Sequence, residues 1–181
     1  MDSRTSSGTI SGKKVNIGTD VPFIKPGDIF PTDIRYDNEG LSAYGQAKYG
    51  RLAPKGSVLM VCIGTIGKCN ILERKSSFNQ QINSITPSSG IVPHLILYAL
   101  RSPYFQAEAW RRSSSTTIAI LNKGKWESLP VPLPPLAEQE RIVAKVDELM
   151  VLCDELEAKL TQQQTDADRL TEAMVAAILA P

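Results

Sequence analysis

Hydrophobic and polar residues are arranged differently on the two sides of Pro135. Upstream of it, short apolar runs are separated by Pro, Gly and polar clusters, a pattern typical of strands joined by turns. Downstream of it, apolar residues recur at spacings of four and three, and neither Gly nor Pro interrupts the chain between Leu136 and Ala180. The sequence therefore predicts an α+β fold, with a mixed, strand-rich globular domain over residues 1–135 and a long helix over residues 136–181.

Three segments of the first part carry strand signals. Val21–Ile29 is expected to form a short strand closed by a type II turn at Pro26 and Gly27. Ser57–Leu72 is expected to form a hairpin with glycines in its loop, and Asn79–Pro87 alternates polar and apolar residues as a half-buried strand does. The segment before Val21 has no sustained periodicity and is expected to form a loop.

Beyond Pro93 the spacing becomes helical and predicts two short helices, interrupted near Pro103. Their apolar face is expected to contain Leu95, Tyr98, Ala99, Phe105 and Trp110. An extended, polyproline-like connector follows, because several prolines fix the backbone there: Pro130, Pro132, Pro134 and Pro135. The last of these is expected to be the first residue of the long helix.

One heptad register runs through the long helix and predicts a coiled coil. At about 1.5 Å per residue its roughly 44 residues make a rod of about 66 Å, and one globular domain cannot cover an apolar stripe of that length. We therefore expect a second long helix as its partner. The predicted dimerisation residues occupy the two core positions of the heptad: Ile142, Val146, Leu149, Cys153, Leu156, Leu160, Leu170 and Met174.

Charge divides the chain at the same place. Residues 1–135 carry 16 Lys or Arg and 9 Asp or Glu, a net charge of 16 − 9 = +7, whereas residues 136–181 carry 4 and 10, a net charge of 4 − 10 = −6. A basic globular part attracts a polyanion, because cationic contacts release counterions from a phosphate backbone. The acidic, heptad-patterned helix is expected to pair with protein.

Several functional classes lack the residues they need. The three cysteines, Cys62, Cys69 and Cys153, have no CxxC spacing and are expected to be reduced thiols, and His94 is the only histidine. A His-based triad or histidine-rich metal site is therefore disfavoured, and His94 itself is expected to be structural. Neither a signal peptide nor a run of about 20 apolar residues is present, so we expect a cytoplasmic protein.

No catalytic residue, metal or cofactor is predicted. Asp28, Glu73 and Lys75 superficially resemble a nuclease carboxylate set, but no second acidic cluster supports metal binding. The chain also lacks an Asn-Pro-Pro-Tyr tetrapeptide, as found in methyltransferases, and a glycine-rich cofactor loop.

The most basic candidate DNA-binding surface lies between the second short helix and the connector. Arg111, Arg112 and Ser114 form either a DNA-facing loop or an ordinary solvated helix end, where positive charge is also favourable. Lys123 and Lys125 lie in an Asn-Lys-Gly-Lys turn and are the better phosphate-binding candidates, because the glycine between them permits close approach of the backbone.

The hairpin and the following strand provide three further candidates. Lys68 in Gly-Thr-Ile-Gly-Lys is expected at the tip of the hairpin, where the alternative is an ordinary turn, since the spacing is not that of a Walker A motif. Gln80 and Gln81 have amides suited to adenine, although a strand directs successive side chains to opposite faces, so at most one would read a base. The alternative is strand packing.

The stretch LPVPLPPLAEQERIVAKVDEL, residues 129–149, closely resembles the junction between a target recognition domain and a conserved helix in specificity subunits of type I restriction-modification systems. VPFIKPGDI, the GTIGK turn, NQQINSITP and TTIAILNKGKWESLPVPLPPL are also similar to that family's recognition domain. The resemblance covers most of the chain from about Val21.

The resemblance implies a non-catalytic subunit that binds double-stranded DNA and recruits methyltransferase and restriction subunits. In that family two recognition domains, joined by two antiparallel helices, each read one half of a bipartite site. This chain holds one such unit, which implies either a fragment or a half-subunit that forms a homodimer through an antiparallel coiled coil. The alternative function is a coiled-coil interaction protein whose basic domain binds an acidic protein.

Overall fold

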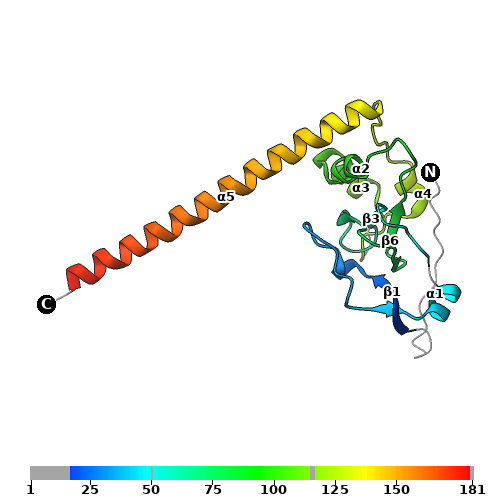
Figure 1. Cartoon of the computed structure of the whole chain (residues 1–181), viewed down its shortest axis with the longest axis horizontal. Helices are drawn as coiled ribbons and strands as arrows, with labels where there is room; N and C mark the ends of the chain where they lie inside the picture. Colours follow the sequence, from blue (N-terminus) through cyan, green and yellow to red (C-terminus); the bar gives the residue numbers. More distant parts are fainter. Residues whose placement is uncertain (1–16, 50, 115–116, 180–181) are drawn as a thin grey trace. The chain divides into compact units, whose positions relative to one another are not determined.

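The computed structural model describes residues 17–49, 51–114 and 117–179, except for the side chains of residue 49 and of residues 176–179 (Figure 1). Strands and short helices make up the chain up to the proline connector, and a single long helix follows, so the predicted α+β fold is confirmed. The chain divides into two compact units, one ending at Gln139 and one beginning at Glu140.

The first sheet contains three strands in the order β2-β1-β5: β1 (Ile17–Ile24) is antiparallel to β2 (Gly40–Leu41) and parallel to β5 (Ser77–Phe78). The expected loop before Val21 is therefore wrong for residues 17–20, and residues 1–16 lie outside the described residues. The first half of β1 is largely exposed and is held by backbone pairing to β2, so it has no hydrophobic alternation to reveal it.

The expected type II turn after β1 is also wrong. Pro26–Asp28 forms a short 3-10 helix, η2, and Gly27 is not among the glycines with positive φ that such a turn requires. The carboxylate of Asp28 accepts a hydrogen bond from the Lys25 backbone N–H at 2.8 Å and closes the helical turn instead. Asp28 is buried, at 2% exposure, and is therefore a structural residue of this bend.

The second sheet has the order β4-β3-β6 and is entirely antiparallel: β3 (Val58–Val61) lies between β4 (Cys69–Ile71) and β6 (Ile82–Ile85). The predicted hairpin and the strand after it are thus confirmed, although β6 is shorter than expected. Successive residues of β3 contribute to different hydrophobic cores, Val58 and Met60 to one and Leu59 and Val61 to the other. Burial on both faces explains why β3 shows no alternation of polar and apolar residues.

Each core is closed by a different set of elements. The first core packs the sheet against three helices, α2 (Pro93–Arg101), α3 (Pro103–Arg112) and α4 (Lys123–Glu127). The second core includes residues from the end of β1, the segment after it and β5. A further helix, α1 (Ala43–Tyr49), contacts β1 and β2.

The two helices expected after Pro93 are confirmed as α2 and α3, but Trp110 is not on their buried face. Its side chain is 49% exposed, whereas Ala109 is fully buried. The Asn-Lys-Gly-Lys turn is also an incorrect prediction, because these residues begin helix α4, with the Asn122 side chain accepting a hydrogen bond from the Lys125 N–H. Trp126 of α4 is buried in the first core.

The long helix is confirmed as α5 (Leu136–Leu179), 44 residues in length. Pro135 precedes the helix instead of starting it, and its carbonyl accepts hydrogen bonds from the N–H groups of Glu138 and Gln139. Among the described residues, no helix has the length and hydrophobicity needed to span a membrane.

Candidate nucleic-acid interface

Three segments that are distant in sequence are hydrogen-bonded together at one end of the second sheet. The Cys62 N–H donates to the Gln81 carbonyl at 2.7 Å, and the Cys62 carbonyl accepts from the Leu121 N–H at 2.8 Å. The Gly64 N–H donates to the Ala119 carbonyl at 2.9 Å. The hairpin loop 62–68, the turn before β6 and the segment leading into α4 therefore form one surface, which we call the loop cluster.

The hairpin loop is fixed by its second glycine. Gly67 has a φ of +100°, and the side-chain amide of Gln106 in α3 occupies the place where a Cβ atom would lie. The same amide donates hydrogen bonds to the carbonyls of Gly67 and Leu100 at 3.1 and 2.6 Å. A residue other than glycine would be strained at this φ and would displace Gln106.

Three of the candidate DNA-binding residues lie in the hairpin loop and in the turn before β6, in positions that differ from those expected. Lys68 is exposed but is not at the hairpin tip, because its carbonyl accepts the Val61 N–H and closes the hairpin stem. Gln80 and Gln81 lie in the turn before β6, so the alternation of a strand does not restrict them. Gln80 is exposed and Gln81 is partly buried.

Ser114 belongs to the same surface. It is exposed and pairs with Ile120 through a β-bridge, and its hydroxyl donates a hydrogen bond to the Ile120 carbonyl at 3.2 Å. Ile118 and Ile120 are exposed at 58% and 39%. The segment returns to the core at Leu121, which is buried.

Arg111 and Arg112 are engaged at the end of α3. The Glu108 carboxylate accepts two hydrogen bonds from Arg111, both at 2.8 Å, and one from Arg112 at 3.2 Å. These contacts, with the Arg111 hydrogen bonds as the largest cause, lower the pKa of Glu108 to about 2. Arg112 also donates to the Ser128 hydroxyl at 2.9 Å. DNA binding by this pair would require exchange of these contacts for phosphate contacts.

The two lysines of α4 differ from each other. Lys123 lies 3.5 Å from Glu127 in an ion pair, whereas the exposed Lys125 has no ion-pair partner among the described residues. Lys125 is therefore the more available of the two cations.

The predicted dimerisation residues lie along α5. Ile142 and Val146 are partly buried, and the others on the stripe are exposed, including Leu149 at 47%, Leu156 at 50% and Leu160 at 63%. The remaining members are also exposed: Cys153, Leu170 and Met174.

The cysteines and the histidine form no reactive centre among the described residues. Cys62, Cys69 and Cys153 are free thiols, and burial raises the pKa of Cys62 to about 12. His94 is exposed in the first turn of α2 and lies beside the Tyr98 ring. The described residues contain no group of His, Cys, Asp or Glu side chains arranged to hold a metal ion.

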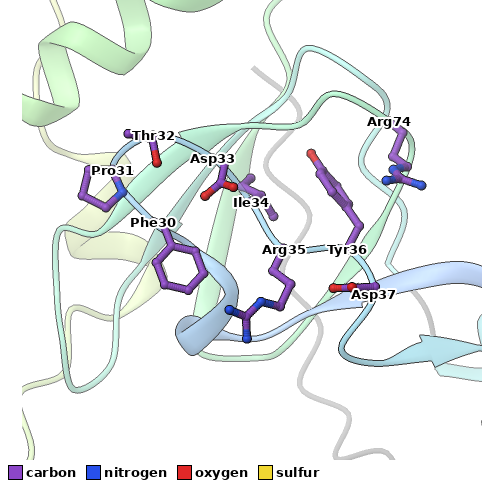
Figure 2. A pocket seen from close by; sticks show the side chains of 9 residues that line it. All are labelled: Phe30, Pro31, Thr32, Asp33, Ile34, Arg35, Tyr36, Asp37 and Arg74. Atoms are coloured by element: carbon purple, nitrogen blue, oxygen red, sulfur yellow. The ribbon is translucent and has the colours of Figure 1, made fainter.

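A pocket of about 600 Å³ that the sequence does not predict lies beside the second core (Figure 2). It is lined by residues 30–37 and by Arg74. Arg35 lies over the Phe30 ring and Arg74 over the Tyr36 ring. The available signal was the alternation of aromatic and charged residues in Phe-Pro-Thr-Asp-Ile-Arg-Tyr-Asp, but Arg74 is too distant in sequence for that pattern to include it.

Comparison with known proteins gives consistent relatives. The chain is 28% identical over 127 residues to the specificity subunit of the type I restriction enzyme EcoBI from Escherichia coli, covering 67% of this chain and 26% of that protein. It is 28% identical over 138 residues to a putative type I specificity subunit, S.HindORF215P, from Haemophilus influenzae, covering 76% and 35%. The chain thus spans about a quarter to a third of these relatives.

Solved structures show the same fold. The HsdS subunit from Thermoanaerobacter tengcongensis matches with a TM-score of 0.73 and 20% identity over 95% of this chain and 40% of that one. A structure from a study of complex assembly and conformational transition of the type I R-M system matches with a TM-score of 0.75 and 22% identity, over 95% and 41%.

The family match extends across both compact units. Residues 5–165 match the model of the type I restriction modification DNA specificity domain, which includes the strand-rich unit and more than half of α5. The chain therefore belongs to the family of type I restriction-modification DNA specificity domains.

Proposed function

We propose that this chain is a DNA sequence-specificity component of a type I restriction-modification system, in which its basic unit reads one half of a bipartite site. The observation that carries this proposal is the family match over residues 5–165. The chain acts in the cytoplasm, without a cofactor and without catalysing the reaction. Its relatives EcoBI and S.HindORF215P carry names that describe the same role.

The loop cluster provides side chains suited to DNA. Lys68 has the positive charge that phosphates require, and Gln80 has an amide that can form two hydrogen bonds with adenine. Lys125, in the neighbouring helix α4, is a second exposed cation. Backbone hydrogen bonds hold the loops of the loop cluster on the sheet, so readout groups here would be preorganised.

The long helix supplies the assembly function of this proposal. Leucines that are 47% to 63% exposed form a stripe that needs a partner, and a second copy of the same helix in antiparallel orientation would cover it. Such a homodimer presents two recognition units, one for each half-site. The related structure from the study of type I complex assembly supports a further role in binding modification and restriction subunits.

The alternative function, a coiled-coil protein whose basic unit binds an acidic protein, has the same charge pattern but lacks support from the family match.

Salt is expected to act in opposite directions on the two proposed interactions of this chain, DNA binding and helix pairing. DNA binding weakens steeply with salt because counterions are released. The pairing of two α5 helices is expected to strengthen with salt, because residues 136–181 carry a net charge of 4 − 10 = −6 in each copy.

The test is selection of bound duplexes from a randomised library by the full chain, followed by binding at several salt concentrations. We expect a bipartite sequence to be selected and to stay bound in excess unrelated duplex; binding with no sequence preference would refute the proposal.

The salt slope, the slope of the logarithm of the binding constant against the logarithm of salt concentration, counts phosphate contacts. If Lys68 contacts a phosphate, Lys68→Ala should lower the salt slope by about one. Lys55→Ala is the matched control. Lys55 is also exposed but precedes β3, whereas Lys68 follows the end of β3 where the hairpin loop of the loop cluster begins.

A further inference from the structure

The pocket formed by residues 30–37 and Arg74 holds two arginines on aromatic rings. The guanidinium carbon of Arg74 lies 4.4 Å from the centroid of the Tyr36 ring, and that of Arg35 lies 5.3 Å from the centroid of the Phe30 ring. Figure 2 shows that Phe30, Arg35 and Tyr36 come from one loop, while Arg74 reaches the pocket from a separate segment. A stacked guanidinium keeps its N–H edge available for hydrogen bonding.

The start of the loop is fixed by backbone and side-chain contacts. Ile29 and Ile34 form a β-bridge, and the Arg35 N–H donates a hydrogen bond to the Asp28 carbonyl at 2.8 Å. The Asn70 side chain donates to the Phe30 carbonyl at 2.9 Å. The Arg101 guanidinium donates to the Pro31 carbonyl at 2.7 Å.

The aromatic support of Arg74 is also fixed. The Tyr36 hydroxyl accepts a hydrogen bond from the Glu73 N–H at 2.8 Å, which ties the ring to the segment that carries Arg74. Burial is the largest cause of the raised pKa of Tyr36, so its hydroxyl stays neutral at physiological pH. The pocket therefore presents its arginines from a preorganised frame.

The charges around the pocket are balanced. Asp33 and Asp37 provide two carboxylates against the two guanidiniums, and all four side chains belong to exposed residues. Within the described residues, none of the four forms an ion pair. Their hydrogen-bonding groups are thus available to a ligand.

We propose that this pocket reads the major-groove edge of a G·C base pair within the half-site. Arg35 or Arg74 supplies the planar fork for guanine O6 and N7, and Asp33 or Asp37 accepts a hydrogen bond from the cytosine amine. A phosphate offers only acceptors and a full negative charge, which the two carboxylates disfavour. A base-pair edge offers both acceptors and a donor, which matches the mixed set of groups.

This inference rests on the proposed function, and its test begins with the site selected by the wild-type chain. Arg74→Lys and Arg35→Lys keep the charge but remove the fork. At least one of them is expected to lose discrimination at the G·C pair by roughly 5- to 150-fold, with unchanged affinity for unrelated duplex and an unchanged salt slope. Arg51→Lys is the matched control, because Arg51 lies over the Phe78 ring and outside this pocket.

The carboxylates are tested by Asp33→Ala and Asp37→Ala, of which at least one should relax preference at the same base pair. Thermal unfolding of each variant establishes that the chain is folded, and the two arginine variants provide independent readouts. A uniform loss of affinity with a salt slope lowered by about one would identify a phosphate contact and overturn the proposal. Unchanged selection in every pocket variant would also overturn it. A wild-type chain without any sequence preference would instead refute the proposed function, and this inference with it.

Discussion

Replacing two leucines of the α5 stripe should separate the proposed dimer without unfolding the first compact unit. Leu156 and Leu160 are adjacent core positions of the heptad, and their side chains are 50% and 63% exposed. The change to be made is Leu156→Glu with Leu160→Glu. Both positions lie in the second compact unit, which begins at Glu140, so the hydrophobic cores of the first unit do not contain them.

The size of the effect follows from the exposed fraction of each side chain. Complete burial of a leucine is worth about 1.5–3 kcal/mol, and about half of each side chain remains to be buried, which leaves about 1 kcal/mol per leucine. Two leucines in each of two copies give about 4 kcal/mol, which corresponds to a roughly thousandfold weaker dimer. Burial of the new carboxylates would weaken it further.

Sedimentation equilibrium of the full chain over a range of concentrations measures this change. Ala158→Glu with Thr165→Glu is the matched control, because it adds the same charge at heptad positions outside the stripe. Fluorescence of the buried Trp126 checks that the first unit stays folded. The coiled-coil reasoning is refuted if the leucine variant, the control and the wild type all sediment with the same mass.

Three further predictions concern the first unit and the thiols. Because hydrogen bonds from Arg111 lower the pKa of Glu108 to about 2, its contribution to stability is complete above the ordinary glutamate pKa of 4.5 and is lost as the pH falls toward 2. NMR titration should show this midpoint, and Arg111→Ala should raise it; an unmoved midpoint contradicts the assignment. At neutral pH a maleimide should label the exposed Cys153 of the Leu156→Glu, Leu160→Glu variant at once but Cys62, whose pKa burial raises to about 12, only after unfolding, as mass spectrometry of the labelled peptides would show. Asp28→Ala should destabilise the chain by about 2 kcal/mol in urea unfolding, because two hydrogen-bond donors lose their acceptor, and Asp28→Asn should cost less.

Elements with a strong local signal were predicted well from the sequence. The long helix, the pair α2 and α3, and the hairpin of β3 and β4 each combine hydrophobic spacing with Pro or Gly at their ends. The start of β1 was missed, because backbone pairing with β2 forms an exposed strand without requiring a hydrophobic pattern. The turn expected at Gly27 failed because Asp28, the fourth residue of that turn, accepts a hydrogen bond from the Lys25 N–H through its carboxylate, and Gly27 does not take the positive φ of a type II turn.

The candidate site was only partly accessible to sequence reasoning. Lys68, Gln80 and Ser114 were singled out separately, but their common surface depends on the hydrogen bonds of Cys62 with Gln81 and Leu121, which join distant segments. Glu108 and Arg111 are three residues apart, a spacing at which side chains pair on a helix, so their contact can be predicted from the sequence. Pairing of Arg74 with Tyr36 depends on tertiary structure and leaves no periodic signal.

Gln139 gives a physical reason for the glutamine in the LPPLAEQERI stretch that carried the family resemblance. Its side chain is buried, at 3% exposure, and accepts a hydrogen bond from the Val92 N–H at 2.9 Å. Its amide donates to the carbonyls of Gly90 and Pro134 at 3.1 and 2.8 Å. One side chain thus joins the proline connector, the segment before α2 and the first turn of α5, and these contacts satisfy the hydrogen-bonding groups of its own buried amide. The first turn of the long helix is therefore part of the first compact unit, which explains why that unit ends at Gln139 and extends beyond the last proline of the connector.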